Sequence, residues 1–158
     1  MVMVARAALG VVALALAIGT AAATETEVSD GGITFTVVDE RSIPKPLTDT
    51  AGDPVNGAKV VASRSLGNCL ACHVVTKLSN EPFQGNVGPS LDGVATRYTP
   101  EELRLQIVNS KVLNPDSVMP AFFRTAGLVG VREDFVGKTM LTPQQVEDVV
   151  AFLSGLKE

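Results

Sequence analysis

The feature that most constrains the structure of this chain is a five-residue motif with two cysteines and a histidine, Cys69-Leu70-Ala71-Cys72-His73. The 158-residue sequence has two cysteines and one histidine, so the motif holds all of them. A structural zinc site needs four such ligands, and the motif offers three. A thioredoxin-like dithiol needs a βαβ context, whereas this motif lies between helical and loop segments. We therefore expect covalent haem attachment through both thiols, with the histidine imidazole bound to the iron.

The N-terminus has the pattern of a secretory signal sequence. Arg6 precedes an apolar stretch over residues 7–18, and Ala21-Ala22-Ala23 provides an A-x-A cleavage site. We expect residues 1–23 to be removed and the protein to be exported, which in a bacterium means to the periplasm. An uncleaved anchor is the alternative, because the uncharged run over residues 7–23 is at the lower limit for spanning a bilayer. After cleavage we expect no membrane association.

The single histidine also limits the second axial ligand of the iron, because the chain has no further histidine. A methionine thioether is the usual alternative. Without the predicted signal sequence, the methionines are Met119 and Met140. Pro120 favours an extended conformation at Met119, and a rigid loop can aim a side chain at an iron. We predict Met119 as the distal ligand, with core packing as its alternative, and a core role for Met140.

Three residues after the motif are candidates for supporting the haem. A ligating histidine normally donates its other ring N–H to an acceptor, and the Pro89 carbonyl in the Gly-Pro-Ser-Leu sequence 88–91 can accept it. A simple turn is the alternative. Arg97 and Tyr98 are candidates for hydrogen bonds to the haem propionates, which are costly to bury without partners. A solvated surface position is the alternative for Arg97.

Three helix starts can be read from the sequence. In each, an Asp or Thr N-cap precedes a proline at the first helical position, and the last two are capping boxes. They are Asp53-Pro54, Thr99-Pro100-Glu101-Glu102 and Thr142-Pro143-Gln144-Gln145. Apolar residues recur at helical spacing after each start. They are Val55, Ala58, Val61 and Ala62; Leu103, Ile107 and Val108; and Val146, Val149, Val150, Leu153 and Leu156.

Two segments carry no helix signal. Residues 24–52 form an N-terminal arm with a strand-like run over 33–38, and residues 111–140 are irregular, a length that usually has a functional reason. The predicted fold class is all-α, with an arm that can add one or two short β-strands. The arm could pair with a partner, or it could be a solvated tail or a wrap on the chain's own domain.

The charge of the chain excludes one class of partner. Residues 24–158 carry 12 basic and 17 acidic side chains, which is a net charge of about −5. Nucleic-acid binding needs clusters of basic residues that displace counterions from phosphate, so we expect no nucleic-acid partner.

The order of these features resembles class I cytochromes c over residues 53–158. The order is a helix, the cysteine motif, Gly88-Pro89-x-Leu91, a helix, Met119-Pro120 and a C-terminal helix. The resemblance implies a monohaem domain over 53–158 whose first and last helices cross, with Gly57 and Phe152 at the crossing. It also implies that Met119 is the distal ligand and that the Pro89 carbonyl orients His73.

Three segments, 85–98, 118–123 and 141–153, resemble the SoxX family more closely, as do the arm and the long segment after Met119. SoxX is the monohaem subunit of SoxAX cytochromes. The resemblance implies a periplasmic heterodimer with the larger cytochrome SoxA. Such a complex oxidatively joins thiosulfate to a cysteine of the carrier SoxYZ, and a small cytochrome c accepts the electrons.

The residues also limit the part this chain can play in an enzyme. Haem attachment uses both cysteines and the iron uses the histidine, so we assign no catalytic residue to this chain and expect it to transfer electrons. One alternative is a free-standing electron shuttle, and another is a sensor or peroxidase with an open distal site. Phe122 and Phe123 are expected either at an exposed electron-transfer edge or as a cover for the haem.

Overall fold

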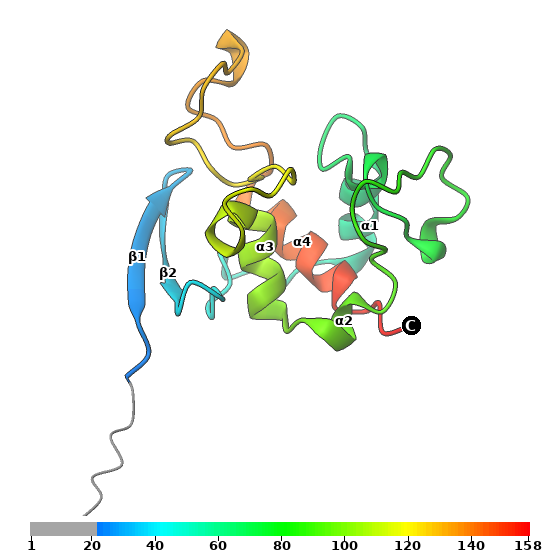
Figure 1. Cartoon of the computed structure of the whole chain (residues 1–158), viewed down its shortest axis with the longest axis horizontal. Helices are drawn as coiled ribbons and strands as arrows, with labels where there is room; N and C mark the ends of the chain where they lie inside the picture. The colour runs from blue at the N-terminus through cyan, green and yellow to red at the C-terminus, as the bar shows by residue number, and fades with distance from the viewer. Residues whose placement is uncertain (1–21) are drawn as a thin grey trace, which may run out of the picture.

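The computed structural model describes residues 22–158, which form four α-helices and a two-stranded antiparallel sheet (Figure 1). The predicted signal sequence lies almost wholly outside this range, and its cleavage stays a prediction. No helix within residues 22–158 has the length and apolar character needed to cross a bilayer. The strands are β1 (Glu25–Asp30) and β2 (Ile33–Val38), and the helices are α1 (Pro54–Ala62), α2 (Val94–Arg97), α3 (Pro100–Leu113) and α4 (Pro143–Leu153). Short 3-10 turns cover Cys69–Ala71, Thr76–Leu78 and Glu133–Phe135.

All three predicted helix starts are confirmed. The Asp53 carboxylate accepts a hydrogen bond from the Val55 backbone N–H, and Pro54 occupies the first position of α1. The Thr99 and Thr142 hydroxyls accept from the backbone N–H groups three residues on, and the side chains there accept in return. These boxes satisfy N–H groups that have no partner inside a helix, so they fix where α3 and α4 begin.

Helices α1 and α4 cross in close contact, as predicted for Gly57 and Phe152. A Cβ atom on Gly57 would lie 2.0 Å from the Asp148 backbone oxygen and 2.9 Å from the Phe152 Cβ. This approach turns Gly57, Val60 and Val61 toward α4 and leaves Val55 65% exposed. The apolar stripe predicted through Val55 is therefore wrong at that residue, because the glycine contact sets which face of α1 is buried.

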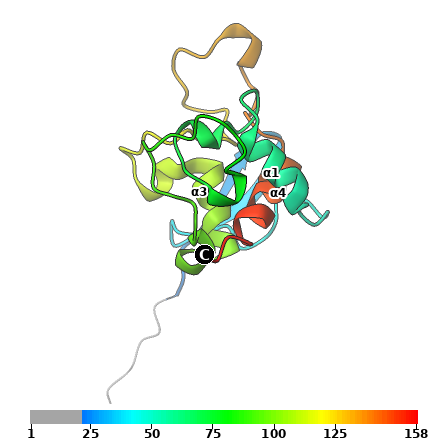
Figure 2. The ribbon, with the colours of Figure 1, turned by 90° about the vertical axis from the view of Figure 1, so that its right-hand side faces the viewer.

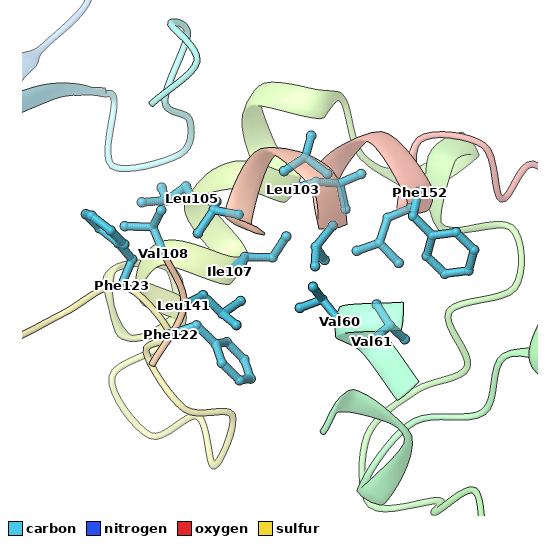
Figure 3. Close-up of a cluster of buried hydrophobic side chains, with 14 of the residues drawn as sticks. Val60, Val61, Leu103, Leu105, Ile107, Val108, Phe122, Phe123, Leu141 and Phe152 are labelled. Atoms are coloured by element: carbon cyan, nitrogen blue, oxygen red, sulfur yellow. The ribbon is translucent and has the colours of Figure 1, made fainter. Parts of the chain in front are cut away.

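The core lies between α1, α3 and α4. Figure 3 shows apolar side chains from all three helices meeting, together with Phe122, Phe123 and Leu141 from the segments between α3 and α4. The apolar residues predicted on α3 and after Thr142 are all buried: Leu103, Ile107, Val108, Val146, Val149, Val150, Leu153 and Leu156.

The N-terminal arm packs on the chain's own domain. Its hairpin pairs Glu25 with Val38 and Asp30 with Ile33, and it includes the predicted strand over 33–38. Phe35 is buried and meets Phe123 edge to face, with ring centroids 6.4 Å apart. The arm therefore wraps on the chain's own domain through β2, which was one of its predicted alternatives. Strand β1 lies at the outer edge of the sheet.

A buried ion pair fastens the arm to the helices. Arg104 of α3 donates to both carboxylate oxygens of Glu147 of α4, at 2.8 and 2.9 Å. The same guanidinium donates to the Ile43 carbonyl at 2.7 Å, and Glu147 accepts from the Leu47 backbone N–H at 2.9 Å. Both charged side chains are about 95% buried, so the arm, α3 and α4 share one network.

Residues 124–140 form a loop that projects from the domain in both views (Figures 1 and 2). Its base is fixed, because Thr125 donates from its backbone N–H and its hydroxyl to the Asp30 carboxylate. Beyond that base, its large apolar side chains are exposed. They are Leu128, Val129, Phe135, Val136 and Met140, with Val129 98% exposed. Met140 is 49% exposed, so its predicted core role is wrong.

Candidate haem site

The two cysteines lie on one tight turn just after α1. Asn68, with φ +48°, reverses the chain, and a 3-10 turn over Cys69–Ala71 follows. The backbone N–H groups of Cys72 and His73 both donate to the Cys69 carbonyl, at 3.1 and 2.9 Å. Both side chains are partly buried thiols without a disulfide. Burial raises the pKa of the Cys69 thiol to about 11, so the chain without haem keeps this group protonated at neutral pH.

His73 is oriented by the residues predicted to orient it. Its Nδ1 lies 2.6 Å from the Pro89 carbonyl oxygen, which leaves Nε2 free to bind iron. Gly88 lies against the ring, since a Cβ there would be 2.3 Å from the His73 Cε1. The close approach is held by a backbone hydrogen bond of 2.8 Å from the Gly88 N–H to the Cys72 carbonyl.

Arg97 braces the segment that carries Pro89. Its guanidinium donates to the Ser90 and Asp92 carbonyls, at 2.8 and 2.9 Å. The Asp92 carboxylate accepts from the Thr76 backbone N–H and hydroxyl, and these bonds lower the pKa of that carboxyl. The predicted contact of Arg97 with a propionate stays a prediction, alongside this bracing. Tyr98 follows α2 and is 48% exposed.

Met119 is contacted by two polar side chains of α3. The buried Ser110 hydroxyl donates to the Met119 carbonyl at 2.8 Å, and the Gln106 amide lies 3.6 Å from the Met119 sulfur. The Lys111 ammonium donates to the Ser117 carbonyl, which braces the loop on its other side. The loop before Pro120 is therefore tied to one helix at several points.

A break in α3 fixes the residues after Met119. Asn109 has non-helical angles (φ −156°, ψ 88°), which opens the helix. The carbonyls of Ile107 and Val108 then accept from the backbone N–H groups of Phe122 and Phe123, at 3.1 and 3.2 Å. These bonds draw both rings into the core, where they are 5% and 1% exposed. Of the two alternatives for Phe122 and Phe123, the exposed edge is wrong for this reason.

The residues present fit a covalently attached haem. Two free thiols share one turn, and the imidazole beside them keeps one nitrogen for iron because the other faces the Pro89 carbonyl. Figure 1 shows the motif segment on the α1 side and the Met119 segment on the α3 side, with α4 between the two helices. Apolar side chains from α1, α3 and the segment after Met119 meet in the core between the two sides, including Val60, Ile107 and Phe122 (Figure 3).

Comparison with known proteins identifies the class. The cytochrome c family model matches residues 54–157, and the chain belongs to the cytochrome c family. It is a class I haem electron-transfer protein with one covalently bound c-type haem. A chain in the crystal structure of SoxXA from P. pantotrophus is similar to it, with 38% sequence identity and a TM-score of 0.70. The match covers 75% of this chain and 92% of that chain, and it supports the predicted SoxX-type cytochrome. A search of curated proteins found no match.

Sequence reasoning missed Gln106 and Ser110, which contact Met119. A signal was present, because two polar residues four apart interrupt the apolar run of α3 and so share one helix face. The helix break at Asn109 left no comparable signal, since its neighbours read as continuous helix. The Arg104–Glu147 pair was also missed, because its members are 43 residues apart in the sequence.

Proposed function

We propose that this chain is the electron-transfer subunit of a SoxAX-type complex, which joins thiosulfate to a carrier cysteine. The observation that carries the proposal is the 38% identity to a chain of SoxXA over 92% of that chain. The partner would be a larger SoxA-type cytochrome, SoxYZ would bind transiently, and a small cytochrome c would take the electrons. We also propose cleavage of residues 1–23, a periplasmic location, an arm over 24–52 and a haem domain over 53–158.

Within the site, Cys69 and Cys72 would hold the haem, and His73 and Met119 would bind its iron. The bound group supplies reversible one-electron exchange. The chain's part is to hold both ligands rigidly, which the Pro89 and Ser110 contacts support. Arg97 and Tyr98 would donate to the propionates. With His73 and Met119 both bound, the iron would have no open position for a substrate, which would suit electron transfer.

The chemistry of thiosulfate coupling would belong to the partner. Forming a sulfur–sulfur bond between a thiol and thiosulfate releases one proton and two electrons, so it needs a reactive group and an electron outlet. Haem attachment and ligation use both cysteines and the single histidine of this chain. This subunit would therefore receive the two electrons one at a time and pass them on.

A free-standing shuttle is the second candidate. It needs neither an arm nor a projecting loop, whereas this chain has both, and the loop exposes five large apolar side chains. Several large apolar side chains exposed on one projecting loop favour a protein interaction site there. We therefore place the contact with the larger cytochrome at the loop over 124–140.

The axial ligand is tested with two methionine variants of the haem-loaded protein. Oxidised cytochromes with iron–methionine bonding have a weak red absorption band from the sulfur–iron bond. We expect Met119→Ala to abolish this band and to lower the reduction potential, and Met140→Ala to leave both unchanged. Loss of the band in Met140→Ala alone would overturn the assignment.

The electron-transfer role is tested by rapid mixing. The oxidised complex is mixed with thiosulfate and a SoxYZ-type carrier, and reduction of this chain's haem is followed by absorbance. We expect reduction that requires the larger cytochrome, and none with this chain alone. Equal reduction without the larger cytochrome would contradict the proposed division of labour.

A further inference from the structure

We infer that Gln106 of α3 is a positioning residue for the electron-transfer site, whose amide donates a hydrogen bond to the Met119 sulfur and raises the reduction potential. The inference rests on the proposed ligation by Met119. It adds a role for a residue that neither binds iron nor touches the cysteine motif.

Two polar side chains of α3, Gln106 and Ser110, contact Met119, but at different atoms. Ser110 donates to its backbone carbonyl, whereas the Gln106 Nε2 lies 3.6 Å from its thioether sulfur, within range of a hydrogen bond to sulfur.

This difference separates two effects on the ligand. The Ser110 bond restrains the Met119 backbone and so fixes the position of its Cα atom. The Gln106 bond engages the sulfur lone pairs, one of which would bind iron. The bond is partly buried, and a hydrogen bond is stronger in such surroundings than in water.

The expected direction follows from electrostatics. An N–H donor withdraws electron density from the sulfur, which weakens its donation to the more demanding ferric iron. The positive end of the amide dipole also faces the sulfur and would disfavour the additional positive charge of an oxidised iron bound there. Both effects raise the reduction potential. Removing the amide should therefore lower the reduction potential. Because an apolar replacement excludes water equally well, this change would not come from solvent exposure.

The test compares Gln106→Leu with Ser110→Ala in the haem-loaded protein. Reduction potential is measured by spectroelectrochemistry, and the ferric iron–methionine band reports whether the sulfur is bound. We expect Gln106→Leu to keep the band and shift the potential downward. Ser110→Ala should leave the potential close to that of the wild type, while imidazole displaces the methionine at about tenfold lower concentration. Such a change corresponds to about 1.4 kcal/mol of lost restraint.

Several outcomes would overturn the inference. An unchanged potential in Gln106→Leu with the band intact would show that the contact has no electronic effect. Loss of the band would show that Gln106 holds the ligand and does not tune it. Absence of the band in the wild type would instead refute ligation by Met119, which is a failure of the proposed function.

If a variant fails to load haem, a measurement on the wild type still tests the inference. In two-dimensional NMR of the reduced protein, the side-chain amide protons of Gln106 should be shifted by the haem and exchange slowly with solvent. The exposed side chain of Asn80 provides the comparison. Unshifted Gln106 protons that exchange as fast as those of Asn80 would overturn the inference.

Discussion

At the scale of single residues, the site depends on close approaches that leave no room for a methyl group. Gly88 lies against the His73 ring, and Pro89 receives the ring hydrogen bond one residue later. A side chain at position 88 must therefore displace either the ring or the backbone that holds it. The imidazole, the glycine and the carbonyl function as one unit.

We expect Gly88→Ala to reduce haem loading and to destabilise the loaded protein by about 1–3 kcal/mol, as overpacking typically does. The added Cβ would lie 2.3 Å from the His73 Cε1. Haem content per protein and denaturant unfolding measure the effect. Gly155→Ala is the matched control, because its Cβ would be 3.3 Å from the nearest atom at an exposed position. Equal behaviour of the two variants would contradict the close approach at His73.

Asp148 gives the crossing of α1 and α4 a pH dependence. Burial on its own raises the pKa of this carboxyl, but hydrogen bonds from the Asp53 backbone N–H and from the Gln144 and Asn56 amides outweigh it, so the pKa is lowered. A carboxyl with a lowered folded-state pKa stabilises the fold above its unfolded value of about 3.9, and this stabilisation is lost as pH falls toward the folded value.

We therefore expect Asp148→Asn to be about 1–3 kcal/mol less stable than the wild type at pH 7, because its amide cannot accept all three bonds. The difference should shrink when the pH falls below 4. Chemical unfolding at several pH values measures this. A difference that is constant from pH 7 to pH 3 would show that the charge of Asp148 does not contribute.

At the scale of elements, the arm is fixed by polar bonds at its C-terminal half and by aromatic packing at its hairpin. Arg104 donates to the Ile43 carbonyl, and Glu147 accepts from the Leu47 N–H. The ion pair therefore connects two helices to a segment without regular structure. A buried ion pair adds little stability compared with apolar side chains in its place. Removing only one partner leaves the other charge buried without a counter-charge, which is strongly destabilising.

We expect Arg104→Met to destabilise the protein by about 3–5 kcal/mol, because Glu147 remains buried without its partner. The double variant Arg104→Met, Glu147→Leu should recover much of that loss. Thermal unfolding of the two variants and of Glu147→Leu forms a complete double-mutant cycle. Additive losses in the double variant would mean that the two charges act independently.

The local signals in the sequence specified the helices but not their irregularities. Asp53, Thr99 and Thr142 predicted the starts of α1, α3 and α4, because capping depends on neighbouring residues alone. The strand over 33–38 was also predicted, while its partner β1 was not, since its polar sequence lacks a clear apolar alternation. The face of α1 and the break at Asn109 depend on contacts with distant residues, which short-range patterns do not contain.

For the site, the contact between His73 and Pro89 was predictable because the motif and the Gly-Pro turn are each short and distinctive. The bracing by Arg97 and the approach of Gln106 to Met119 were not, because they depend on how α2 and α3 are placed in three dimensions. The burial of Phe122 and Phe123 was not predictable either, because it depends on their backbone bonds to the α3 carbonyls that the helix break leaves free.

At the scale of the whole molecule, the haem domain is compact, whereas the loop over 124–140 projects from it. Five large apolar side chains exposed on one loop are unfavourable in water, and they become favourable when a partner covers them. The loop is also tethered beside the β-hairpin through Thr125 and Asp30. One end of the proposed contact loop is therefore anchored to the domain.

The most direct test of the proposed subunit role is native mass spectrometry of the haem-loaded protein, co-produced with a SoxA-type cytochrome and exported. We expect a one-to-one heterodimer with a single haem on this chain, and its dissociation constant should rise at least tenfold in the double variant Val129→Ser, Val136→Ser. The absorption spectrum of that variant should not change, because both side chains are exposed on the projecting loop. A single-haem chain that stays monomeric beside its partner would contradict the subunit role and leave a free electron shuttle.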